Sequence, residues 1–266
     1  MTAAATCTLL AGMLLAASAP AQPACGPHVA ALYPYARFYY EDARQGPGGM
    51  DKDMFDELAR RSGCTLRQVV ESRARIWDRM RRGSVQLTLS ALSTPQRREV
   101  AEFVFYAQAH YQALMGQALA RRVRSMAAFE ADPALRLLVV RAYAYGPQID
   151  AWVQRLRAQG RLVETGDFTT ALRMLRAGRA DALLTLPSSW QGISAAYEDE
   201  NGLALVDVAP GERNLVGLAL AHAMPEADRQ RLRQALKSML ADGSVLEILR
   251  RHLGERTARA AFYAGD

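Results

Sequence analysis

The stretch GGMDKDMFDELARRSGC, residues 48–64, decides how the first half of the chain folds. Its apolar residues recur at helical spacing, and Gly63 suits the left-handed position that ends a helix. Apolar, strand-like runs lie on either side of it, at residues 28–34 and 65–71. The order strand, helix, strand predicts two parallel strands joined by a helix that covers one face of their sheet.

The same alternation continues through the rest of the 266-residue chain. Further on, it predicts a helix over residues 73–83, a strand over 84–92 and a helix opened by Ser93 or Thr94. The later segments are an extended run over 111–120, strands over 135–143, 161–166, 181–189 and 214–222, and helices over 125–131, 147–160, 167–180, 225–243 and 244–254. We therefore expect an α/β fold of two lobes, with extended crossings near residues 108–116 and 213–222.

The amino-terminal 21 residues contain no charged side chain and end in Ala19-Pro20-Ala21, a sequence that a signal peptidase could cut. Their apolar run is too short for a comfortable membrane span, which needs about 20 residues. We expect a cleaved signal peptide over residues 1–21 and a periplasmic mature protein. An uncleaved anchor is the alternative.

Three cysteines are present, and removal of the signal would leave Cys25 and Cys64 without Cys7. Each of the two precedes a predicted strand, and the starts of neighbouring parallel strands lie side by side. In an oxidising compartment such a pair favours a disulfide bond. Two unrelated thiols are the alternative.

The net charge of +6 comes almost entirely from arginine, since only two of the 33 basic residues are lysine. The arginines are spread along predicted helices beside acidic residues, which argues against a nucleic-acid partner. The sequence contains no nucleophile elbow, phosphate loop or metal-binding motif, so we expect no catalytic residue, cofactor or metal. The histidines show no ligand spacing, and surface or hinge positions are expected for all four: His28, His110, His222 and His252.

Two arginines follow a predicted helix start in SALSTPQRRE, residues 90–99. Pro95 suits the first helical position, and an exposed cation in the first turn opposes the helix dipole at a cost of roughly 0.3–1 kcal/mol. A bound anion would reverse that cost, because free N–H groups and a guanidinium can hold a carboxylate together. We predict that Arg97 binds an anion and that Arg98 faces solvent. A surface arginine without a ligand is the alternative.

Aromatic residues crowd the stretch YPYARFYYED, residues 33–42, and could supply walls for a ligand. We expect that its five rings cannot all be buried in so short a loop. In the second half, Arg141 ends a strand just before Tyr143 and Tyr145. It could meet a ligand from the opposite lobe, and a solvated arginine is the alternative.

Taken in order, these segments resemble the family 3 extracellular solute-binding proteins, the amino-acid receptors of ABC importers, from about Pro27 to Leu253. GGMDKDMFDEL looks like the family's G-F-D-x-D-L helix opening, and STPQRREVAEFVFY looks like its T-x-x-R segment with the F-S-x-P-Y that follows. The remaining similar pieces are YPY (33–35), WDRMRRGSVQ (77–86), AGRADALLTLP (177–187) and MLADGSVLEILRRHLG (239–254).

The resemblance implies a type II periplasmic-binding-protein clamshell whose lobes each contain a mainly parallel sheet flanked by helices. Lobe 1 would comprise residues 22–110 and 217–266, and lobe 2 residues 111–216. The protein would be a monomer that captures a small carboxylate-bearing, anionic solute, an amino acid or a related organic acid, for an ABC permease in the inner membrane. The ligand-binding residues expected on this basis are Arg97 for the carboxylate, with Thr94, Ser90, Tyr35, Arg141 and Tyr143.

Two positions depart from the family pattern. Leu92 stands where the family usually has Ser or Thr, and Leu186 stands where amino-acid receptors usually carry the Asp that binds the ligand's ammonium. Burying an ammonium without a counter-charge is expensive, so a carboxylate without an amine is one reading. The alternatives are a periplasmic accessory or sensory protein that binds a protein partner and, less favoured because no cleft acid or base is evident, an enzyme on the same scaffold.

Overall fold

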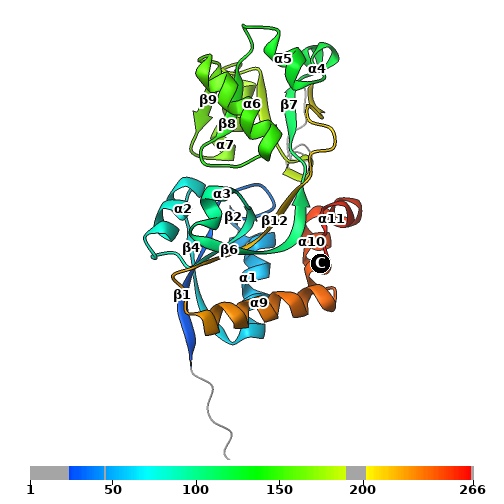
Figure 1. Cartoon of the computed structure of the whole chain (residues 1–266). Coiled ribbons are helices and arrows are strands. Elements are labelled where there is room, and N and C mark those ends of the chain that lie inside the picture. Colours follow the sequence, from blue (N-terminus) through cyan, green and yellow to red (C-terminus); the bar gives the residue numbers. More distant parts are fainter. Residues whose placement is uncertain (1–23, 45, 190–201, 265–266) are drawn as a thin grey trace, which may run out of the picture.

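The computed structural model describes residues 24–44, 46–189 and 202–264, which form two lobes (Figure 1). The predicted signal peptide and Cys7 lie outside the described residues. Within the described part, no helix is long and apolar enough to cross a membrane. The chain is an α/β protein with one five-stranded sheet in each lobe, as the alternation of predicted strands and helices indicates.

The first lobe is built on a five-stranded sheet. Its strands lie in the order β4 (Cys64–Val70), β1 (Cys25–Leu32), β5 (Leu87–Leu92), β12 (Asn214–Ala221) and β6 (Ala101–Ala109). Only β12 runs against the other four strands. The helices of this lobe are α1 (Met50–Ser62), α2 (Arg73–Arg81), α3 (Pro95–Arg98), α9 (Glu226–Ala241), α10 (Ser244–Leu253) and α11 (Glu255–Ala261), and a small hairpin joins β2 (Tyr40–Asp42) to β3 (Gly46–Gly48).

The second lobe repeats this plan on a second five-stranded sheet. Its strands lie in the order β11 (Leu203–Val206), β7 (Gln112–Gly116), β10 (Ala182–Thr185), β8 (Leu137–Val140) and β9 (Leu162–Thr165). Here β7 is the strand that runs against the others. The helices described in this lobe are α4 (Gln117–Arg122), α5 (Met126–Glu130), α6 (Pro147–Ala158) and α7 (Phe168–Arg176).

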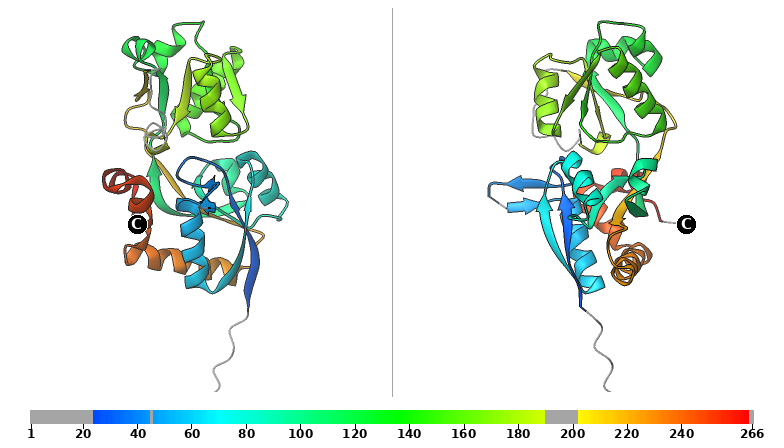
Figure 2. Two further views of the ribbon diagram at one scale, coloured as in Figure 1. Left: turned by 180° about the vertical axis from the view of Figure 1, so that it is seen from behind. Right: turned by 60° about the vertical axis from the view of Figure 1, so that its left-hand side comes forward.

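Two segments connect the lobes, one from β6 into β7 and one from β11 into β12 (Figures 1 and 2). His110, between β6 and β7, ties them together: its Nε2 lies 2.8 Å from an Asp207 carboxylate oxygen, and its Nδ1 lies 2.7 Å from the main-chain oxygen of Glu212. Its expected hinge position is therefore confirmed.

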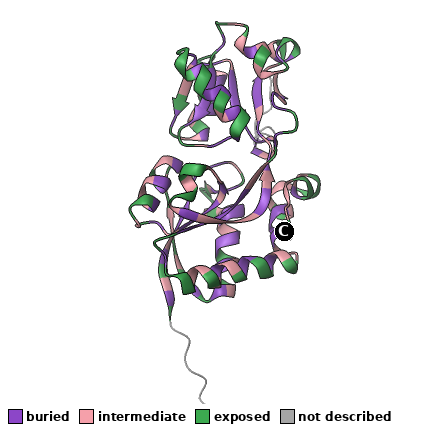
Figure 3. Cartoon of the chain, in the orientation of Figure 1, coloured by how far each residue is buried: buried purple, intermediate pink, exposed green. Residues whose placement is uncertain are grey.

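Each sheet is buried between helices that expose one face and bury the other (Figure 3). In α1 the buried face includes Met54, Phe55 and Leu58, and Gly63 ends the helix in the predicted left-handed conformation, with φ of 65°. The periodic apolar residues therefore determine both the formation of α1 and the face that packs on the first sheet.

The predicted disulfide joins Cys25 to Cys64. The two residues open β1 and β4 and are register partners in this parallel pair, with Cα atoms 4.5 Å apart. Because 39 positions separate them in the sequence, the cross-link stabilises the fold by about 4 kcal/mol in the chain-entropy treatment.

Several short elements differ from the sequence prediction. The run over 111–120 is extended only as far as Gly116 and then turns into α4, and the helix opened by Thr94 has four residues. Sequence periodicity did not predict β6, β11 or α11. The first two pair with β12 and β7, so partner strands distant in sequence determine them.

Candidate ligand-binding site

Contacts between the lobes gather just beyond the carboxyl ends of β1 and β5 in the first lobe and of β8 and β10 in the second. Ligands of open α/β sheets bind at this end of the strands. Five of the residues predicted to bind a ligand follow these strands, and Ser90 lies near the end of β5, so the cleft between the lobes is the candidate site.

Arg97 links the two lobes. Thr94, the N-cap of α3, accepts a hydrogen bond from the Arg97 main-chain N–H at 3.3 Å. The guanidinium lies over the ring of Trp77, 4.5 Å from its centre, and donates to Leu92 O at 2.7 Å and, across the cleft, to Ala142 O at 2.8 Å. Burial lowers the pKa of Arg97, and the nearby positive charge of Arg73 acts in the same direction.

A second guanidinium, that of Arg73, is buried in the same region. It lies 3.5 Å above the ring of Tyr33 and donates to Ser90 O at 3.0 Å and, at longer range, to Thr88 and Leu89. Among the described residues, neither this guanidinium nor that of Arg97 forms an ion pair with a carboxylate. The cleft therefore holds two cations whose hydrogen-bond acceptors are neutral.

Sequence reasoning missed Arg73, although a signal was available. Arg73 is the first residue of α2, directly after its N-cap Ser72. A cation at a helix start is also the feature that predicts anion binding by Arg97.

The hydroxyl of Ser90 is engaged in hydrogen bonds within the first lobe. Its hydroxyl donates to Asp51 at 2.7 Å, and its main-chain N–H donates to the Tyr106 hydroxyl at 2.9 Å. Asp51 is only 1% exposed, and this burial raises the pKa of its carboxyl to about 7, although the bond from Ser90 and the charge of Arg73 oppose the shift.

Aromatic rings from both lobes fill the centre of the cleft. The ring of Tyr35 meets those of Tyr143 and Phe168 edge-on, with centroids 5.6 and 4.8 Å away. Its hydroxyl accepts a hydrogen bond from the main-chain N–H of Leu186 at 3.2 Å and lies 3.4 Å from the Thr185 hydroxyl. Tyr35 and Tyr143 thus meet in the candidate site.

The expectation that the five rings of residues 33–42 are not all buried is confirmed, although only one ring escapes full burial. Four of the five are buried, and Tyr40 is half-buried. The loop is too short to bury them by itself, but rings of the second lobe cover it, including Tyr143, which meets Tyr33 edge-on at 5.8 Å. Burial by the opposite lobe has no local sequence signal.

A cavity of about 310 Å³ adjoins the rings on the side of the lobe connections. Its lining is mainly apolar and includes Leu186 from the second lobe, with Ser90, Tyr106 and Tyr111. On the other side of the rings, Arg73 and Tyr143 line a second, more open hollow. Of the six predicted ligand contacts, Ser90 lines the cavity and Tyr143 the hollow. The other four belong to neither set of lining residues and remain predicted contacts: Arg97, Thr94, Tyr35 and the exposed Arg141.

Two of the other histidines, for which surface or hinge positions were expected, instead pair with an acidic residue inside the first lobe, one of them buried and the other half-buried. His28 is 6% exposed and pairs with Asp228 of α9, with 2.8 Å between Nε2 and a carboxylate oxygen. His252 makes the same kind of contact with Asp53 at 2.8 Å. Each pairing joins residues about 200 positions apart, which single-sequence spacing cannot show.

The sequence profile of the bacterial extracellular solute-binding proteins, family 3, matches residues 28–255. This chain belongs to that family. The match spans most of both lobes, and it confirms the resemblance found in the ordered motifs. Among curated proteins, none matches the sequence.

Solved structures of low sequence identity share the fold of this family member. The solute receptor for L-cysteine of Neisseria gonorrhoeae is 19% identical, with a TM-score of 0.72 over 89% of this chain and 95% of that one. A histidine kinase sensor domain similar to periplasmic binding proteins is 16% identical, with a TM-score of 0.72 over 86% and 97%. An ancestral amino-acid-binding protein, described as a precursor of cyclohexadienyl dehydratase, is 19% identical, with a TM-score of 0.68 over 85% and 94%. These neighbours support the type II clamshell fold.

Proposed function

We propose that this family 3 protein captures a small carboxylate-bearing anion in the periplasm and delivers it to an ABC permease of the inner membrane. The observation that carries the proposal is Arg97, whose guanidinium lies between the lobes and, among the described residues, has main-chain oxygens but no carboxylate as partners. Arg97 is half-buried and has no carboxylate partner in the described part of the chain, so an anionic ligand would supply the charge-assisted contact that its guanidinium lacks.

Closure follows from the geometry of Arg97. One guanidinium nitrogen holds Leu92 O of its own lobe, and the other reaches Ala142 O of the opposite lobe. When the lobes separate, the second nitrogen becomes available to a carboxylate. A ligand that contacts both lobes then favours the closed state by its additional contacts there. Thr94 contributes by fixing the main chain of the Arg97 turn, and Ser90 by holding the strand end.

The chemistry of the cavity lining favours an organic acid over an α-amino acid. Leu186 presents an apolar side chain to the cavity at the position where amino-acid receptors usually carry an acid. A ligand ammonium would find no counter-charge there and would lose its hydration. We therefore assign the solute to small carboxylic acids that carry an apolar part and lack a free amine.

The remaining assignments belong to the same proposal. Residues 1–21 act as a cleaved signal, the mature protein is a monomer without enzymatic activity, and the lobes divide at residues 22–110 with 217–266 and at 111–216. A disulfide between Cys25 and Cys64 is compatible with the oxidising periplasm.

The test is a thermal-shift screen of the purified protein against 2-keto acids, dicarboxylates, aliphatic carboxylic acids and the matching amino acids. At 100 times its dissociation constant, a ligand adds about 2.7 kcal/mol to the free energy of unfolding. We expect a rise in melting temperature with an acid, and a smaller rise with the amino acid of the same carbon skeleton. A response to sugars or to amines alone would contradict the proposal.

A second candidate function is supported by the aromatic packing. The ring of Tyr35 packs against those of Tyr143 and Phe168 across the lobes, and a histidine kinase sensor domain shares the fold. An accessory or sensory protein that offers a fixed surface to a protein partner would use such packing. If no compound in the screen changes the melting temperature, the result would favour this function.

A further inference from the structure

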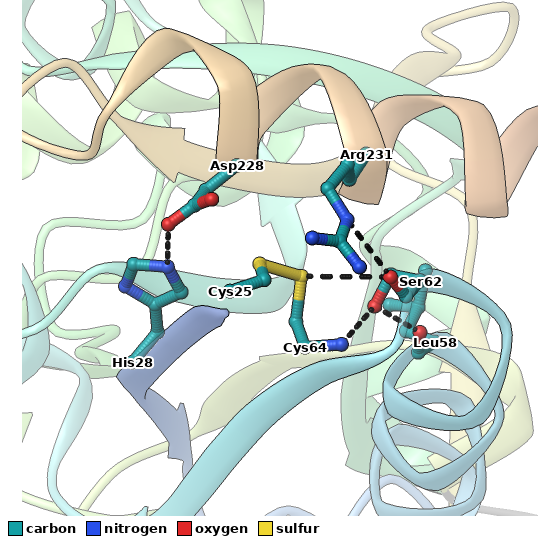
Figure 4. The surroundings of a disulfide bond; sticks show 7 residues. All are labelled: Cys25, His28, Leu58, Ser62, Cys64, Asp228 and Arg231. Atoms are coloured by element: carbon teal, nitrogen blue, oxygen red, sulfur yellow. Dashed lines mark hydrogen bonds and ion pairs between the residues drawn. A yellow bond between two sulfur atoms is a disulfide. The ribbon is translucent and has the colours of Figure 1, made fainter. Parts of the chain in front are cut away.

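The disulfide lies at the start of β1, at the end of the first lobe that is away from the second lobe (Figure 1). Beside it are side chains of types that can bind metals (Figure 4). Cys25 and Cys64 are each 4% exposed and open two neighbouring strands. His28 lies three residues further along β1, and Asp228 reaches the same place from α9. Two strands and one helix thus bring four potential ligands together.

The distances among these groups are those of a compact metal site. One ligand atom each from Cys25, His28 and Asp228 can be chosen so that all three lie within 4.8 Å of one another. His28 Nε2 and an Asp228 carboxylate oxygen are 2.8 Å apart, and Cys64 Sγ is bonded to Cys25 Sγ. While the disulfide is intact, both sulfurs lack the negative charge that makes a cysteine a ligand.

We propose that reduction of this disulfide creates a zinc-binding site formed by Cys25, Cys64, His28 and Asp228. A dithiol reductant gives two electrons and two protons to the S–S bond and becomes a disulfide itself, which leaves two thiols in the protein. Zn²⁺ then displaces one proton from each thiol and binds two sulfurs, one imidazole nitrogen and one carboxylate oxygen. Two sulfurs, a nitrogen and an oxygen are a donor set that suits tetrahedral zinc.

The surrounding charges favour such a site. Two thiolates and one carboxylate carry three negative charges, so the zinc complex has a net charge of −1. Arg231, which donates to the main-chain oxygen of Ser62 at 3.1 Å, lies beside the sulfurs and supplies the opposite charge (Figure 4). The Asp228 side chain is 15% exposed, which gives an ion access from solvent.

The proposed ion would take over the mechanical role of the disulfide. It would tie β1 to β4 as the disulfide does, and it would add a link to α9 through Asp228. The first lobe could then keep its fold under reducing conditions.

The experiment uses the chain with Cys7→Ser, so that every thiol signal comes from this pair. Oxidised protein and phosphine-reduced protein are titrated with ZnCl₂ against a chromogenic chelator, and with CoCl₂ to detect a thiolate-to-cobalt charge-transfer band. We expect one equivalent bound to the reduced protein, with the band, and at least tenfold weaker binding to the oxidised protein. Equal binding by the two forms would overturn the proposal.

Variants separate a folded site from two free thiols. His28→Gln and Asp228→Asn should each weaken zinc binding by the reduced protein at least tenfold. His252→Gln, which removes the similar contact with Asp53 but no proposed ligand, should leave it unchanged. If His28→Gln binds zinc as tightly as the parent, only the thiols are responsible and the proposal fails.

A second measurement, by circular dichroism, addresses the case in which the protein unfolds when the disulfide is reduced. If the reduced protein unfolds without metal, one equivalent of Zn²⁺ added during reduction should restore the circular dichroism of the oxidised protein. An unfolded spectrum in the presence of zinc would likewise refute the site.

Discussion

Replacement of Asp51 by asparagine should change how stability depends on pH. Asp51 is nearly fully buried in α1, and burial raises the pKa of its carboxyl from 3.8 to about 7. Between these values the folded state binds more protons than the unfolded state, so the free energy of unfolding falls as the pH rises. A shift of about three pKa units corresponds to about 4 kcal/mol, lost progressively between pH 4 and pH 8.

The Asp51→Asn variant cannot ionise, and its side-chain oxygen can still accept the bond from Ser90. Urea unfolding at pH 4, 5, 6, 7 and 8 should therefore show the variant gaining about 4 kcal/mol on the parent across this range. Asp56→Asn, at an exposed position on the same helix, is the matched control. A difference between variant and parent that stays constant from pH 4 to pH 8 would refute the reasoning.

Two further substitutions test the packing. A Cβ at Gly217 would clash with the main-chain oxygen of Val104, so Gly217→Ala should lower the free energy of unfolding by roughly 2–3 kcal/mol. Gly166→Ala, at an exposed position with open space around it, is the control and should change the free energy of unfolding by less than about 0.5 kcal/mol in the same urea series. Tyr35→Phe removes the hydroxyl that accepts from the Leu186 N–H across the cleft, so the closed arrangement should lose about 1 kcal/mol and the radius of gyration in solution scattering should increase; an unchanged radius would count against this bond as a latch.

Features encoded in short stretches could be predicted from the sequence. The helix over residues 50–62 follows from its periodic apolar positions and Gly63. Thr94 was one of two predicted caps, and the structure selects it. The disulfide was predictable because each cysteine precedes a strand, so that parallel pairing alone brings the two together.

Features that depend on the second lobe or on distant pairing could not be read in this way. The burial of Tyr33 and Tyr35 requires rings from the opposite lobe, and that of His28 requires Asp228, 200 positions away. The cleft arginine Arg73 carried a local signal, its position at a helix start, but nothing in the sequence alone shows that it turns into the sheet.

The most direct test of the central claim compares Arg97→Ala with Arg98→Ala. The ligand is the carboxylic acid that most raises the melting temperature of the parent, and its dissociation constant is measured by calorimetry. Loss of a charge-assisted contact worth about 2 kcal/mol should weaken binding by Arg97→Ala about 30-fold or more. Arg98, whose side chain is exposed, should be replaceable without loss. Equal affinity of Arg97→Ala and the parent would contradict the account.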